Sequence, residues 1–85
     1  MNREKLLIRL NRGDVDNVSF GDMKRLVEWF GFALARTAGS HHIYKHPMMP
    51  GLLNLQDAGG EAKPYQIRQF LQQVERYNIH GKIEE

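Results

Sequence analysis

The sequence predicts an α+β fold, a two-layer sandwich in which two amphipathic helices cover one face of a three-stranded antiparallel sheet. Two segments, residues 20–30 and 64–77, each carry a single apolar stripe at helical spacing. Between them lie three short segments of strand-like composition, separated by turn residues. The sheet and both helices each have one apolar face to bury, so packing the two helices on the same side of the sheet satisfies all of them.

Residue types at the helix ends support these boundaries. Ser19 is a favourable N-cap for the first of the two helices, and Gly31 is the residue type that commonly follows a helix. Pro64 suits the first turn of the final helix. A further helix is predicted over residues 2–12, where leucines recur at helical spacing before Gly13. The two main stripes consist of Phe20, Met23, Leu26, Val27 and Phe30, and of Ile67, Phe70, Leu71 and Val74.

Three strands are predicted over residues 32–37, 41–46 and 52–55. Gly39 and Ser40 are expected to form a tight turn between the first two strands. Residues 47–51 contain two prolines and are expected to be a loop. Residues 56–63 are mostly polar and contain Gly59 and Gly60, so a second loop is expected before the final helix. The face of the sheet without helices is then open to solvent or to a ligand.

The composition excludes several classes of protein. The chain has 85 residues, 41% of them hydrophobic, which suits one small globular domain. It has no cysteine, which excludes disulfides and cysteine-based zinc sites and fits a reducing cytoplasm. No apolar run approaches the ~20 residues of a membrane span, and Arg9 interrupts the apolar residues near the N-terminus, so we expect a cytoplasmic protein without a signal peptide. The net charge of +2 permits nucleic-acid binding.

Three of the four histidines lie in the block of residues 39–47, within the second predicted strand. Side chains alternate along a strand, so His42, Tyr44 and His46 share one face, and His41, Ile43 and Lys45 share the other. If Tyr44 faces the helices, then His41 and Lys45 emerge on the open face, whereas burial of Ile43 exposes His42 and His46. We favour burial of Tyr44, because it offers the larger apolar area.

The residues alone leave four interpretations of this block. The histidines share no role, or they bind a metal, although His42 and His46 would lie ~13 Å apart along an extended strand and no acidic residue in the block completes a shell. In the third, one histidine takes a proton from the 2′-hydroxyl of RNA while Arg36 and Lys45 stabilise charge on the phosphorane, which requires no metal. In the fourth, Arg36, Lys45 and Lys63 only bind the RNA backbone.

The block and the elements around it resemble the HicA-type toxins of bacterial toxin–antitoxin systems over residues 23–79. The motifs that carry the resemblance are Phe30-Gly31-Phe32, the stretch from Arg36 to His42, and Tyr44 followed by His46-Pro47. The resemblance implies a fold similar to the double-stranded-RNA-binding domain, α-β-β-β-α, with an extra N-terminal helix in this chain. It also implies an mRNA interferase, an endoribonuclease that cleaves mRNA independently of translation.

The resemblance further implies specific site residues and partners. The catalytic histidine follows the Gly-Ser turn, which makes it His41, or His42 if the strand register is shifted; we prefer His41. No metal or organic cofactor is implied. The partners are single-stranded mRNA and a HicB-type antitoxin that covers the active site, and no membrane partner is expected. The residues expected to bind RNA phosphates are Gly39, Ser40, Arg36, Lys45 and Lys63.

We divide the chain into an N-terminal helical extension (residues 1–18), a HicA-like domain with the fold of a double-stranded-RNA-binding domain (residues 19–79) and a frayed tail (residues 80–85). The favoured function is metal-independent RNA cleavage with a histidine as general acid or base. The alternatives are a non-catalytic RNA-binding module on the same fold and an inactive toxin-like protein that binds an antitoxin.

Overall fold

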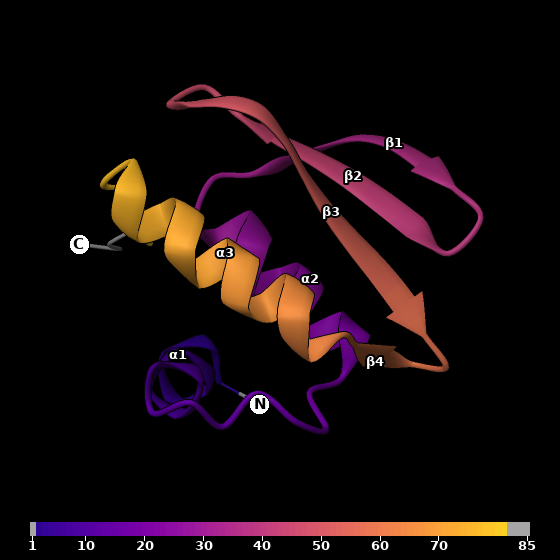
Figure 1. Ribbon diagram of the computed structural model, residues 1–85, viewed down its shortest axis with the longest axis vertical. Helices are drawn as coiled ribbons and strands as arrows, with labels where there is room; N and C mark the ends of the chain where they lie inside the picture. The colour runs from indigo at the N-terminus through magenta and orange to yellow at the C-terminus, as the bar shows by residue number, and fades with distance from the viewer. Residues whose placement is uncertain (1, 82–85) are drawn as a thin grey trace.

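The computed structural model describes residues 2–81 and has the predicted α+β fold (Figure 1). Helices α2 and α3 cover one face of an antiparallel sheet, and α1 lies on the side of these helices that faces away from the sheet (Figure 1). The arrangement α-β-β-β-α with an additional N-terminal helix is therefore confirmed. The elements are α1 (Arg3–Asn11), α2 (Phe20–Trp29), β1 (Ala33–Ala38), β2 (His41–His46), β3 (Met49–Ala58), β4 (Glu61–Ala62) and α3 (Pro64–Arg76).

The sheet has a short fourth strand that we had expected to be part of a loop. β3 continues to Ala58 and pairs with β4 through Asp57↔Ala62 and Ala58↔Glu61. The chain reverses at Gly59 and Gly60, whose φ angles are +64° and +92°, a conformation that glycine adopts without strain. The polar composition of residues 56–63 concealed this hairpin, although the glycine pair is a typical hairpin turn.

β3 also begins earlier than predicted, at Met49 rather than at residue 52. Residues 47–51 were expected to be a loop because they contain two prolines. The pairing of β2 with β3 is irregular between Tyr44 and His46, where a bulge accommodates the extra residues of β3, including Pro50 and Gly51. A bulge is one of the few places in a sheet that tolerate proline, because the proline nitrogen has no hydrogen to donate to the ladder.

Both ends of α2 are satisfied by hydrogen bonds from neighbouring residues. The Ser19 side chain accepts from the backbone N–H of Asp22 at 3.0 Å, which confirms the predicted N-cap. At the other end, Gly31 N–H donates to the Glu28 carbonyl and Phe32 N–H donates to the Val27 carbonyl, the pattern of a Schellman motif. The chain therefore leaves α2 in a defined direction and enters β1.

Helix α1 contributes side chains to the same hydrophobic core as the sheet and the other two helices. Leu6 and Leu10 are each 1% exposed and belong to the same cluster of buried side chains as residues of α2, β2, β3 and α3. The predicted N-terminal extension thus packs on the rest of the chain. Of the predicted frayed tail, His80 is exposed, and residues 82–85 lie outside the described part of the chain.

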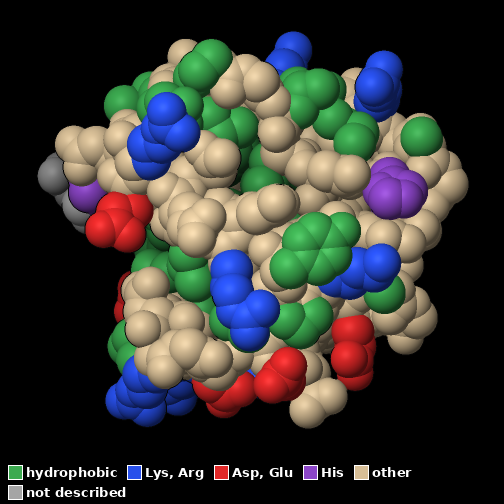
Figure 2. All heavy atoms as spheres, viewed as in Figure 1, with side chains coloured by type: hydrophobic (Ala, Val, Ile, Leu, Met, Phe, Trp, Pro, Cys, Tyr) green, Lys and Arg blue, Asp and Glu red, His purple; other side chains and the backbone are tan. Residues whose placement is uncertain are grey.

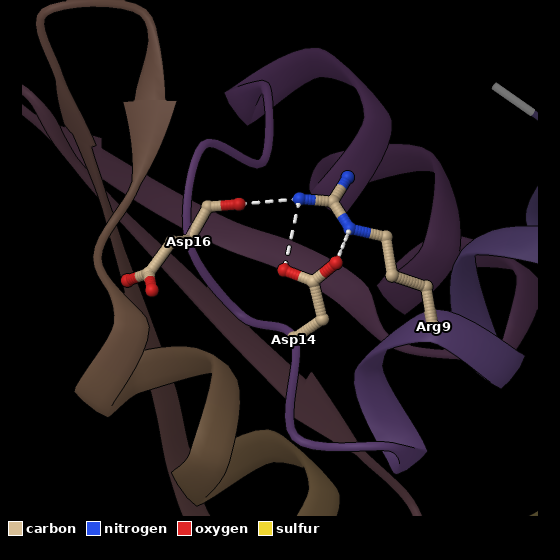
Figure 3. Close-up of polar contacts among 3 residues, drawn as sticks. All are labelled: Arg9, Asp14 and Asp16. Atoms are coloured by element: carbon tan, nitrogen blue, oxygen red, sulfur yellow. Dashed lines mark hydrogen bonds and ion pairs between the residues drawn. The ribbon is translucent and has the colours of Figure 1, made fainter.

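An ion pair fastens α1 to the segment that leads to α2 (Figure 3). The Arg9 guanidinium donates to the Asp14 carboxylate, with 3.0 Å between Nε and Oδ2, and also to the backbone carbonyl of Asp16. A planar guanidinium suits such a contact because it carries several donors in fixed directions. These contacts of Arg9 fix the turn that follows α1, a few residues before the N-cap of α2 at Ser19.

Tyr44 occupies the centre of the interface between the sheet and the helices. It is fully buried, and its hydroxyl has no hydrogen-bond partner within the described residues. Burial, together with the nearby Glu28 carboxylate, raises the pKa of Tyr44 to about 12. The ring contributes apolar area, whereas the hydroxyl is a buried polar group without compensation.

We expect Tyr44→Phe to leave the fold intact and to change the alkaline stability. An unfolded tyrosine loses its proton near pH 10, whereas the folded protein retains it up to about pH 12, so deprotonation favours the unfolded state and the stability of the wild type falls as the pH rises from 10 towards 12. Urea unfolding at pH 7 should show the variant equal to the wild type or up to ~1 kcal/mol more stable.

The same unfolding curves at pH 10–12 should fall more steeply for the wild type than for Tyr44→Phe, because the variant lacks the titrating hydroxyl. Parallel loss of stability in the two proteins over this range would contradict the assignment.

Candidate functional site

The buried Tyr44 determines the orientation of every side chain on β2. The favoured orientation is confirmed: Tyr44 faces the helices, and His42 and His46 lie on the same side. His41 and Lys45 therefore project from the open face of the sheet. The three histidines of the block are divided between two faces and have three different environments.

His46 is held on both sides of its ring. Its Nε2 donates to the backbone carbonyl of Phe30 at 3.0 Å, and its Nδ1 accepts from the backbone N–H of Met48 at 3.0 Å. The ring is half-buried, and its centre lies 4.9 Å from the centre of the Phe32 ring in a tilted arrangement. Because both nitrogens are engaged with the backbone, His46 acts as a structural residue that joins the end of α2 to the turn after β2.

His42 is also packed against the helical layer. Its ring lies 4.7 Å from the ring of Phe20, the first residue of α2. Its Nδ1 lies 3.2 Å from the Ser40 carbonyl. A carbonyl oxygen only accepts hydrogen bonds, so Nδ1 carries the proton in this contact. His42 thereby links the β1–β2 turn to the start of α2.

His41 has the arrangement expected of a proton acceptor at a surface. Its half-buried ring places Nδ1 at 3.2 Å from Oδ1 of Asn54 in β3. The Asn54 oxygen accepts from Nδ1–H, so in the neutral ring the lone pair is on Nε2. Asn54 was absent from the residues predicted for the site, because its position beside His41 depends on the pairing of β2 with β3.

A β-bulge brings Arg36 to the same face as His41. Leu34 of β1 lies opposite Tyr44, and without an irregularity Arg36 would lie opposite His42, on the helical side. The bulge between Leu34 and Arg36 shifts the register by one residue, so Arg36 lies opposite Ile43 instead. Arg36 and Lys45, both exposed, therefore share the open face with His41.

The remaining predicted site residues occupy two separate places. Gly39 and Ser40 form the exposed turn between β1 and β2, and Gly39 has a φ of +58°. Lys63 is the half-buried N-cap residue of α3, which follows β4. The β1–β2 hairpin thus carries all the predicted site residues except Lys63, which precedes α3. These residues are Arg36, Gly39, Ser40, His41, His42 and Lys45.

Residues 2–81 contain neither a cluster of metal ligands nor a helix suited to span a membrane. No group of three or more His, Asp or Glu side chains in this part of the chain is arranged to hold a metal ion. None of its helices combines the length and the apolar character required to cross a bilayer.

Comparison with known families identifies the chain. Residues 20–75 match the family model described as the HicA toxin of bacterial toxin–antitoxin systems. The match covers well over half of the 85 residues, and the chain belongs to this family. Members are toxins of toxin–antitoxin systems and generally act as mRNA interferases. No curated protein and no solved structure matches the chain significantly.

Two glycines with the same φ angle provide a test of the structural role of His46. Gly13 and Gly31 both have a φ of +90°, but a Cβ on Gly31 would lie 3.1 Å from His46 Nε2, whereas a Cβ on Gly13 would meet nothing within 4 Å. We expect Gly13→Ala to cost ~1 kcal/mol from backbone strain alone. Gly31→Ala should cost a further ~1–2 kcal/mol, because the added methyl group displaces the hydrogen-bonded ring.

Urea unfolding of both variants measures the difference. Equal losses of stability would mean that the contact of His46 with the end of α2 contributes nothing beyond the conformational preference of glycine.

Proposed function

We propose that this HicA-family protein is a metal-independent endoribonuclease that cleaves mRNA on the open face of its sheet, with His41 as the general base. The observation that best supports this proposal is the contact between His41 Nδ1 and Asn54 Oδ1, which leaves the Nε2 lone pair available. Arg36 and Lys45 lie on the same face and provide the positive charge that a phosphate requires.

The proposed reaction uses the 2′-hydroxyl of the RNA as the nucleophile. His41 Nε2 takes the hydroxyl proton while O2′ forms a bond to phosphorus, and the bond from phosphorus to the 5′-oxygen breaks. The leaving oxygen takes a proton from solvent, which reaches this exposed face. The products are a 2′,3′-cyclic phosphate and a 5′-hydroxyl. Arg36 and Lys45 stabilise the additional negative charge on the phosphorane.

His42, Gly39 and Ser40 have supporting roles in this proposal. The His42 ring holds the Ser40 carbonyl and the start of α2, which orients the turn immediately before His41. Gly39 and Ser40 are exposed, and their small side chains suit the turn for close approach of a phosphate to its backbone N–H groups. We further propose that a HicB-type antitoxin inhibits the enzyme by covering the open face.

The decisive experiment is cleavage of a long single-stranded RNA by purified protein in EDTA. Wild-type protein should cut and leave 2′,3′-cyclic phosphate ends. His41→Ala should lose ~10²–10⁴-fold in rate, the usual contribution of a general base, while its RNA affinity is retained. His42→Ala should retain measurable cleavage. Binding without cleavage by the wild type would contradict the nuclease proposal and favour a non-catalytic RNA-binding module.

Asn54 is expected to act as a positioning residue for His41. Asn54→Ala removes the acceptor at Nδ1 and should lower the cleavage rate ~10-fold or more, because the ring loses its defined tautomer and orientation. Asn54→Asp keeps an oxygen at the same place and should retain more activity than Asn54→Ala.

An NMR measurement tests the Asn54 contact independently of activity. The ¹⁵N chemical shifts of neutral His41 should indicate the Nδ1–H tautomer in the wild type and a mixture of tautomers in Asn54→Ala. An unchanged tautomer in the variant would show that Asn54 does not position the ring.

A further inference from the structure

Tyr65, in the first turn of α3, is an aromatic side chain that the proposed mechanism does not use. It is 53% exposed, and it is the only aromatic residue among the large apolar side chains exposed in residues 2–81. Single exposed apolar residues are common at protein surfaces and require no explanation by themselves. Tyr65 differs from the other exposed apolar residues because its hydroxyl forms a hydrogen bond with a buried side chain.

A buried glutamine fixes the Tyr65 hydroxyl relative to the sheet. Gln66 is 2% exposed, and its Nε2 lies 3.3 Å from the Tyr65 hydroxyl oxygen, which accepts the hydrogen bond. The Oε1 of Gln66 accepts from the backbone N–H of Gln56 at 2.7 Å. Gln66 thus satisfies the edge of β3 just before the residues that pair with β4. The hydrogen bond favours one orientation of the exposed ring, which lowers the entropy lost when a ligand binds.

The hydrogen bonds of Gln66 also relate Tyr65 to His41, the candidate general base. Gln56 is the residue of β3 directly opposite His41 in β2. The Gln66 amide occupies the position of the next strand beside β3, so the Tyr65 hydroxyl lies about two strand spacings, roughly 10 Å, from β2. α3 lies on the helical side of the sheet and His41 projects from the open side, so a single-stranded segment would have to pass round the edge of β3 beside Gln56 to contact both places.

The surroundings of Tyr65 carry positive charge. Lys63 precedes it at the N-cap of α3, and Arg68 follows three residues later, a spacing that places side chains near each other on a helix surface. The face of the molecule drawn in Figure 2 carries several lysine and arginine side chains among apolar ones, with most of its acidic side chains along the lower part. Lys63 lies outside the β1–β2 hairpin, but its position next to Tyr65 in the chain makes it a candidate phosphate contact there.

We propose that Tyr65 is a stacking platform for one unpaired base of the RNA strand whose phosphate reaches His41. Aromatic rings bind bases of single-stranded RNA by stacking, and a neighbouring cation holds the backbone between bases. Tyr65 supplies the ring, and Lys63 supplies the cation. The inference rests on the proposed function, because it assigns a substrate contact to the same RNA.

The test measures RNA affinity in the 85-residue chain that carries His41→Ala, the parent protein for this test, so that the RNA remains intact. Addition of Tyr65→Ala should weaken binding of a short single-stranded RNA roughly 5- to 150-fold, the range for loss of one stacked base. Tyr65→Phe keeps the ring and should stay within a few-fold of the parent. Ile8→Ala, at a residue of α1 that is also 53% exposed, is the matched control and should have no effect.

Salt dependence separates stacking from charge. Tyr65→Ala should leave the slope of log affinity against log salt unchanged, whereas Lys63→Ala should reduce it by about one phosphate contact. An RNA that contains 2-aminopurine should show fluorescence quenching with the parent protein and less quenching with Tyr65→Ala.

The outcomes distinguish the two proposals. Equal affinity of the parent and Tyr65→Ala would overturn the stacking platform and leave His41 catalysis unaffected. Weaker binding by Tyr65→Ala, combined with no cleavage by the wild type, would support the stacking platform and refute the nuclease. An effect of Ile8→Ala as large as that of Tyr65→Ala would show a general change of the surface and would also overturn the proposal.

Discussion

The burial of Tyr44 between the sheet and the helices is the constraint from which the chemistry of β2 follows. Side chains alternate along a strand, so a buried Tyr44 directs His42 and His46 towards the helices and His41 and Lys45 towards the open face. A slip of one residue would exchange the two sets and bury Lys45 without a partner, which is costly for a charged group. Burial of the Tyr44 ring therefore keeps His41 and Lys45 on the open face of the sheet.

The histidine block shows how one residue type serves different purposes within six residues. His46 uses both ring nitrogens to join backbone groups at the end of α2 and after β2. His42 packs its ring against Phe20 and hydrogen-bonds to the Ser40 carbonyl in the turn. Only His41 combines an open face with a ring nitrogen held by a side chain from another strand. The density of histidines in this segment thus reflects structural demands as well as the proposed chemistry.

The helices and their faces could be predicted from the sequence, because apolar spacing and capping residues such as Ser19 and Gly31 are local signals. The orientation of β2 could be predicted too, from the relative size of Tyr44 and Ile43. Asn54 and the approach of Arg36 to the open face could not, since both depend on strand register. β4 was concealed by the polar character of residues 56–63.

The bulge in β1 has a second consequence, which concerns contacts between molecules. β1 lies at the edge of the sheet, and all six of its residues are exposed, so one side of its backbone is free to pair with a strand from another chain. Such pairing requires a regular ladder, and the extra residue between Leu34 and Arg36 interrupts it. The irregularity that carries Arg36 to the open face therefore also protects this small protein from extending its sheet into an aggregate.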